Sequence, residues 1–342
     1  MTVLSILDLV RITEETDARG ALDNARDLAA HAETWGYRRF WVAEHHNMLG
    51  IASAATSVVI GHIAGGTKSI RVGAGGIMLP NHSPYVIAEQ FGTLAQLFPG
   101  RIDLGLGRAP GTDQLTLRAL RRTYEDAESF PQDVLELQAF LAPAGPNQRI
   151  RAVPAAGTEV PLWILGSSTF GAMLAAEFGL PYAFASHFAP ELLLPALQIY
   201  RERFKPSEQL ARSYAMVGVN IIAAATDAEA RRLATTKQMS STDILRGNRG
   251  LSRPPIDDIE SYWSPLEKAE VMRKQARSIV GSPETVRSGI EALVTETGAD
   301  ELMVVSDVYD HSARLRSFEL IAEAAGITSA PHSPFSSETI VA

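Results

Sequence analysis

The chain has 342 residues, of which 46% are hydrophobic, and its formal net charge is −8. This length fits a single α/β barrel with insertions. The acidic balance argues against a nucleic-acid groove or an anionic membrane surface as the partner, and the absence of cysteine excludes disulfides and thiolate chemistry. The N-terminal residues show neither a signal peptide nor a membrane-spanning segment, so we expect a cytoplasmic protein.

Strand-like and helix-like stretches alternate along the chain. Strands are predicted where branched apolar residues run together, and helices where apolar residues recur at helical spacing. The expected strands are residues 3–10, 39–44, 70–79, 101–107, 162–165, 182–186, 214–225 and 301–305. The expected helices are residues 17–35, 52–64, 83–97, 124–141, 170–178, 191–204, 282–297 and 311–325, with a further helix that opens at Asp227.

Eight strands that alternate with helices predict a (β/α)8 TIM barrel. We expect insertions after strands four and seven. Residues 145–160 are rich in Pro, Gly and Ala and predict an excursion, whereas Ser240–Pro265 lacks a sustained apolar period and predicts a long mobile loop that acts as a lid. Residues 1–330 form one expected domain, and residues 331–342 a loosely ordered tail.

Glycines interrupt the third and fourth expected strands. Glycine weakens a strand unless something approaches its backbone closely, so Gly75 and Gly76, with Gly105 and Gly107, suggest backbone kept bare around one ligand. A doubly wound sheet is the alternative fold. It is disfavoured because Gly105, Gly107 and Gly111 do not have the spacing of a dinucleotide-binding fingerprint.

Two strand ends together suggest a phosphate site. Gly166-Ser167-Ser168 leads from a strand into a helix N-terminus, where free N–H groups and the helix dipole attract anions. An ordinary serine cap is the alternative interpretation. Arg108, at the end of the neighbouring strand, could bind the same phosphate, although a β-bulge with a solvated arginine would give the same pattern.

Adjacent histidines follow the second strand. His45 and His46 are neighbours, so on a continuing strand they would point apart, which does not suit the His-x-His pattern of barrel metal sites. His187 is the one other histidine expected at a strand end, and no acidic residue obviously completes a metal set. We therefore expect no metal, and a single histidine that faces the cavity as a proton donor or acceptor.

Taken together, these motifs carry a family resemblance. In order and spacing, the chain resembles the bacterial luciferase-like flavin-dependent monooxygenases from its first strand to about residue 325. Each motif alone is weak, but the set is specific. The motifs are Ala43–His46, Gly73–Pro80, Leu104–Asp113 and Gly166–Ser168.

The resemblance implies a TIM barrel that binds FMN, usually takes it reduced from a separate flavin reductase, and uses O₂ to oxygenate a small organic substrate. It also implies a homodimer through the second and third helices. Carried over by position, the phosphate-binding residues are Arg108, Ser167, Ser168 and the backbone of Gly171.

The resemblance further implies a cis peptide between Gly75 and Gly76 against the flavin ring, and a proton-transfer role for His45. Gly107 stands where luciferase has a reactive cysteine, so light emission is not implied. Two alternatives stay open: a deazaflavin (F420)-dependent oxidoreductase on the same barrel, and a flavin-binding protein without catalysis. A flavin carries out the oxygen chemistry itself, which suits a chain with no convincing nucleophile.

Overall fold

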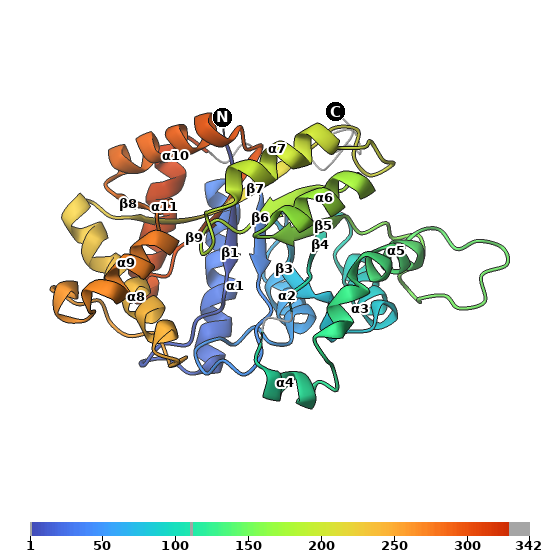
Figure 1. Ribbon diagram of the computed structural model, residues 1–342, viewed down its shortest axis with the longest axis horizontal. Helices are drawn as coiled ribbons and strands as arrows, with labels where there is room; N and C mark the ends of the chain where they lie inside the picture. Colours follow the sequence, from blue (N-terminus) through green and yellow to red (C-terminus); the bar gives the residue numbers. More distant parts are fainter. Residues whose placement is uncertain (1, 110–111, 328–342) are drawn as a thin grey trace.

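The structure, a computed structural model, describes residues 2–109 and 112–327 and contains a closed parallel barrel (Figure 1). β1 pairs with β2 and β9, and β6 pairs with β7, so the sheet closes on itself. The expected (β/α)8 fold is confirmed. The expected tail, residues 331–342, lies outside the described residues. The barrel strands are β1 (Val3–Asp8), β2 (Arg39–Val42), β3 (Arg71–Met78), β4 (Ile102–Gly107), β5 (Leu162–Gly166), β6 (Tyr182–Phe184), β7 (Ala215–Ala223) and β9 (Glu301–Val305).

Helices surround the strands (Figure 1). Asp17, Ser282 and Asp310 precede α1, α10 and α11, and their side chains accept backbone N–H groups of the first turn. Within the described residues, no helix is long and apolar enough to cross a membrane. The helices are α1 (Ala18–Trp35), α2 (Thr56–Gly65), α3 (Pro84–Leu97), α4 (Gln114–Ala119), α5 (Phe130–Leu141), α6 (Thr169–Phe178), α7 (Leu193–Arg203), α8 (Asp227–Leu245), α9 (Pro265–Lys274), α10 (Pro283–Thr297) and α11 (His311–Ala325).

The two insertions contain more regular structure than the sequence predicted. After β4, the helix expected over residues 124–141 is divided into a short 3₁₀ turn (Glu125–Glu128) and α5, and α4 was not predicted. The excursion between α5 and β5 projects from the barrel, on the side away from α8 and α9 in Figure 1. After β7, the three-residue strand β8 (Ile279–Gly281) extends the sheet beside the end of β7, outside the closed barrel.

The prediction of an irregular loop over Ser240–Pro265 is wrong at its N-terminal end, whereas its other end agrees with the start of α9 at Pro265. α8 continues to Leu245, because Thr242 and Met239 are buried against the protein and hold a helix whose polar composition gives little signal. Ser264 and Glu267 form a capping box that starts α9. Between them, the backbone of Ser252 pairs with the segment after β1, through Ser252 N–H to Ile12 O at 3.0 Å.

A buried ionic network lies inside the barrel at the N-terminal ends of the strands. Asp103 on β4 accepts from Arg39 at 2.9 Å and from Arg71 at 2.5 Å, and Glu301 on β9 accepts from Arg39 at 2.8 Å and from the Tyr214 hydroxyl at 2.9 Å. Burial opposes ionisation of Asp103, but the two arginines lower its pKa to about 2. These bonds tie four strands together across the interior.

An apolar layer separates this network from the C-terminal mouth of the barrel. Trp163 packs edge-on against Trp41, with ring centres 5.2 Å apart, and against Tyr214, with ring centres 5.7 Å apart. Leu7 and Met303 belong to the same buried cluster. The interior is therefore packed below the mouth, so a ligand has room only above the strand ends, where TIM barrels place their sites.

Candidate active site

The turn between β5 and α6 presents an uncapped helix N-terminus at the mouth. β5 ends at Gly166, and Ser168 is extended at the N-cap position of α6. The Ser168 side chain makes no capping hydrogen bond, so backbone N–H groups of the first turn, including that of Gly171, can receive an anion. The Tyr182 hydroxyl donates to the Ser168 carbonyl at 3.1 Å and fixes the turn.

Arg108 reaches the same turn from the neighbouring strand. It follows β4, which pairs with β5, and its side chain is exposed. Its guanidinium carbon lies 4.3 Å from the centre of the Phe170 ring, in the first turn of α6. This cation–π contact holds the positive charge beside the helix N-terminus. The structure thus brings Arg108 to Ser167 and Ser168, and the arrangement suits a phosphate group.

A buried carboxylate organises the ends of β2 and β3. Glu44 Oε1 lies 2.8 Å from Nε2 of both His46 and His82, and Glu44 Oε2 accepts the backbone N–H of Met78 at 3.1 Å. Burial opposes ionisation, but the bonds from His46 and His82 lower the pKa of Glu44 to about 2. His46 is therefore turned toward Glu44, and His82 is a member of the cluster that the sequence did not reveal.

The same three residues could form a set of metal ligands, because their ligand atoms lie within 4.8 Å of one another. The expectation that no acidic residue completes a histidine set is therefore wrong: Glu44 does so, together with His46 and His82. Both N···O distances fit charge-assisted hydrogen bonds, and Glu44 also accepts from Met78. We therefore interpret the cluster as hydrogen-bonded support for the ends of the two strands.

Another histidine, His187, follows the end of β6. Burial lowers its pKa to about 3, and the positive charges of Lys237 and His45 act in the same direction while Asp307 opposes them. His187 is therefore a neutral imidazole at neutral pH. The carbonyl of His187 accepts from Asn220 of β7, which lies opposite the end of β9, just before Asp307.

Asp307, just after β9, joins two cations. Its Oδ2 lies 2.8 Å from Lys237 Nζ and 3.1 Å from Arg11 Nη2. Although burial opposes ionisation, Arg11 and Lys237 hold the pKa of Asp307 well below its usual range. No sequence motif predicts this trio, because Arg11 follows β1, Lys237 lies in α8 and Asp307 follows β9, far apart along the chain.

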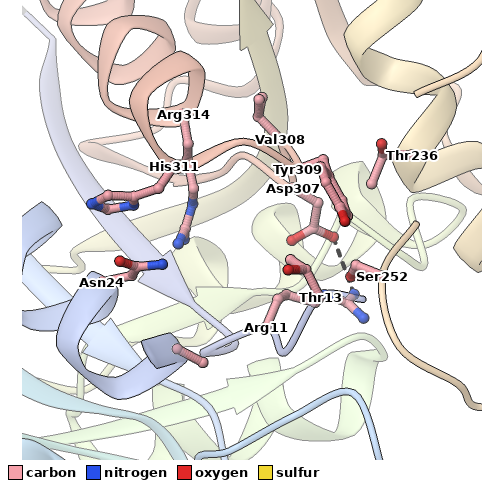
Figure 2. Close-up of a pocket in the computed structure, with 11 residues that line it drawn as sticks. Arg11, Thr13, Asn24, Thr236, Ser252, Asp307, Val308, Tyr309, His311 and Arg314 are labelled. Atoms are coloured by element: carbon pink, nitrogen blue, oxygen red, sulfur yellow. Dashed lines mark hydrogen bonds and ion pairs between the residues drawn. The ribbon is translucent and has the colours of Figure 1, made fainter. Parts of the chain in front are cut away.

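Figure 2 shows a small polar pocket beside this trio. Arg11, Thr13 and Asp307 line one side, and Thr236 and Ser252, from the insertion after β7, line the other. The space inside it that is open to the centre of a water molecule is about 20 Å³. A pocket of this size holds water and no organic ligand of substrate size. The insertion therefore closes the rim of the barrel on the side of β1 and β9.

The glycines of β3 and β4 lie against neighbouring protein atoms. A Cβ atom on Gly105 would lie 2.7 Å from Leu165 Cδ1, and one on Gly75 would lie 2.7 Å from Leu7 Cδ1. Neighbouring protein atoms therefore explain the missing side chains at these two positions, and a ligand against the backbone of Gly75–Gly76 stays a prediction. The cis peptide expected between Gly75 and Gly76 is present.

Comparison with known proteins assigns the family. Residues 2–301 match the model of the luciferase-like monooxygenases. A "Luciferase-like monooxygenase" of Escherichia coli K12 is 53% identical over 317 residues, which cover 92% of this chain and 95% of that one. The structure of apo-MsnO8 superposes with a TM-score of 0.88 at 34% identity and covers 96% of this chain and 99% of that one. The chain belongs to the luciferase-like monooxygenase family, and it is a flavin-dependent oxidoreductase.

More distant structures share the fold with different flavins. The oxygenating constituent of 3,6-diketocamphane monooxygenase from Pseudomonas putida, in complex with FMN, has a TM-score of 0.70 at 20% identity and covers 96% of this chain and 99% of that one. An F420-dependent secondary alcohol dehydrogenase has a TM-score of 0.66 at 14% identity and covers 94% of this chain and 98% of that one. The fold by itself therefore does not decide which flavin binds here.

Proposed function

We propose that the protein is an FMN-dependent monooxygenase, which uses reduced FMN and O₂ to oxygenate a small organic substrate. The observation that carries the proposal is the pairing of Arg108, 4.3 Å from the Phe170 ring, with the uncapped N-terminus of α6. A guanidinium beside free backbone N–H groups is a receptor for a phosphate monoester, and FMN carries one.

In this proposal, the residues at the mouth divide the work of holding the cofactor. Arg108, Ser167, Ser168 and the N–H group of Gly171 bind the phosphate, and Gly75–Gly76 forms the backbone edge against the ring. Reduced FMN, when bound, supplies the electrons for oxygen activation. The protein orients the ring, excludes water through the insertion, and supplies a proton donor or acceptor in His45.

We also propose a separate flavin reductase as a transient partner and a homodimer through α2 and α3. Large apolar side chains are exposed on these two helices: Val58 is 71% exposed, Val86 43% and Leu97 64%. Apolar surface of this kind favours burial against a second copy. The deazaflavin F420 is the competing cofactor. Comparing how strongly the purified chain quenches the fluorescence of FMN and of F420 distinguishes the two.

Replacing Arg108 by alanine is expected to weaken FMN binding by about 10–100-fold, because charge-assisted hydrogen bonds to phosphate contribute about 1.5–3 kcal/mol. Riboflavin lacks the phosphate, so its affinity is expected to change by less than about threefold. Fluorescence titration measures both. Arg149→Ala, at an exposed arginine in the excursion, is the control and leaves both affinities unchanged. Equal weakening of FMN and riboflavin by Arg108→Ala would contradict the phosphate role.

Tryptic cleavage in the exposed part of the insertion after β7 is expected to slow when the cofactor binds. Residues 246–251 are exposed, and Arg249 offers trypsin a site there. Saturating FMN is expected to slow cleavage after Arg249 several-fold if this segment covers the bound flavin. Cleavage after Arg149, in the other exposed loop, serves as the internal control and stays constant. If both sites respond alike, or Arg249 does not respond, the insertion is not a lid over the flavin.

A further inference from the structure

His187 is held with one edge of its ring against the backbone of β7. Its carbonyl accepts from Asn220 Nδ2 at 2.5 Å, and a Cβ atom on Gly218 would lie 2.5 Å from its Nδ1, so the ring rests on the β7 backbone. Nδ1 is buried, and it has no hydrogen-bond partner among the described residues. A buried bare lone pair is less unfavourable than a buried bare N–H, so we assign the proton to Nε2. Nε2 is the other polar atom of the ring, and His187 is partly exposed.

Beside His187, the trio of Arg11, Lys237 and Asp307 carries an excess positive charge. Two cations share one carboxylate oxygen, which leaves a net charge of +1. The three side chains are 17%, 16% and 8% exposed, and Arg11 Nε is buried without a partner in the described part of the chain. Uncompensated charge in a place so poorly solvated is unfavourable, so the trio attracts a counter-anion.

The positions of the strands separate this charge from the phosphate site. The closed sheet runs β1-β2-β3-β4-β5-β6-β7-β9, so the ends of β9 and β1 lie opposite those of β4 and β5. The pocket in Figure 2, on the Arg11 side of the trio, has room only for water. An organic anion must therefore approach the trio from outside this pocket, on the side of Lys237 and His187, neither of which lines it.

We propose that Lys237 and His187 bind the carboxylate of an organic acid, which makes the substrate class of this enzyme a small carboxylic acid. Lys237 supplies the charge, Nε2–H of His187 supplies a neutral donor, and Asp307 holds Lys237 in place without neutralising it, because Arg11 shares the same carboxylate. This inference rests on the proposed function in its choice of substrate, since it leaves the opposite side of the mouth to the flavin phosphate.

Binding of benzoate and of its neutral analogue benzamide, measured by calorimetry on the FMN-loaded protein, tests the subsite. The wild type is expected to bind benzoate in the millimolar range and benzamide at least tenfold more weakly. Lys237→Gln is expected to weaken benzoate binding at least tenfold, whereas Lys237→Arg keeps it. Lys268→Gln, which removes an exposed lysine of the same insertion, serves as the control and changes neither affinity.

Asp307→Asn is expected to change benzoate affinity in the direction opposite to Lys237→Gln, which distinguishes recognition of the anion from a purely structural role. Asp307→Asn removes the negative charge but keeps an acceptor for Lys237, so benzoate is expected to bind several-fold more tightly. If the trio only fastened the insertion, both Lys237→Gln and Asp307→Asn would loosen it, and neither would change the preference for benzoate over benzamide. That result, or equal benzoate affinity in the wild type and Lys237→Gln, would overturn the proposal.

FMN titration of the same samples keeps the two proposals apart. Lys237→Gln is expected to leave FMN affinity unchanged. Failure to bind FMN, with benzoate still selected over benzamide by the FMN-free protein, would refute the proposed cofactor and leave the anion subsite standing. Normal FMN binding without selection of benzoate would refute the subsite alone.

Discussion

Replacing Asp103 by alanine is expected to lower the free energy of unfolding by about 3–5 kcal/mol, as is typical when one partner of a buried ion pair is removed. Asp103 is fully buried and compensates Arg39 and Arg71, which are each 6% exposed. Without it, Arg71 keeps backbone acceptors at Gly100 and Ile102, and Arg39 keeps Glu301, but the two arginines lose the carboxylate that they share. Urea unfolding followed by tryptophan fluorescence measures the loss.

Asp23→Ala provides the matched control, because Asp23 is a half-exposed carboxylate paired with Arg19 at 3.9 Å and Arg26 at 3.8 Å on the surface. Its removal is expected to change stability by no more than about 1 kcal/mol. A loss below about 1 kcal/mol for Asp103→Ala would show that the interior network does not stabilise the barrel.

The same carboxylate predicts a dependence on acid. The pKa of Asp103 is about 2 in the folded protein, below its reference value of 3.8. Because the folded pKa is the lower one, ionised Asp103 contributes its full stabilisation above about pH 4 and loses it as the pH falls through 2. The difference in stability between the wild type and Asp103→Ala is therefore expected to shrink over that interval.

The barrel could be predicted from the sequence because its strands and helices carry local signals. The strand expected at residues 301–305 and the helix expected at residues 311–325 match β9 and α11, since a buried apolar run and an Asp310 cap mark them. The prediction ended α8 too early, because Thr242 and its neighbours are helical through tertiary burial and not through a local sequence signal. β8 has only three residues, which is too short for a periodic pattern.

The candidate site was predictable only where its residues belong to local motifs. Ser167, Ser168 and Arg108 lie at strand ends with recognisable turns, so their meeting at one place could be expected. Lys237 and Asp307 have no such motif, because their pairing depends on how the insertion folds back over β9. Gly105 shows a second limit of prediction from sequence. A glycine in a strand does not reveal whether a ligand or another side chain, here Leu165, occupies the space beside it.

Replacing His45 by alanine is expected to lower substrate oxygenation by about 10²–10⁴-fold, the usual contribution of a positioned acid–base group, while FMN affinity stays within a few-fold. In the proposed reaction, one oxygen atom of O₂ enters the substrate and the other leaves as water, which requires a timed proton. Without that proton, the two electrons of reduced FMN leave with O₂ as hydrogen peroxide. Oxygen uptake, product and hydrogen peroxide are measured together in single turnovers with reduced FMN.

His46→Ala is the matched variant, since it removes the neighbouring imidazole. His46 donates to the buried carboxylate of Glu44 at 2.8 Å, so its loss is expected to lower stability and leave the ratio of product to hydrogen peroxide unchanged. Control of that ratio by His46 would mean that the proton path runs through the Glu44 cluster. Control by His187, which follows β6, would place the acid–base group at the end of that strand. If FMN still binds to His45→Ala and the ratio of product to hydrogen peroxide is unchanged, His45 has no role in the proton step.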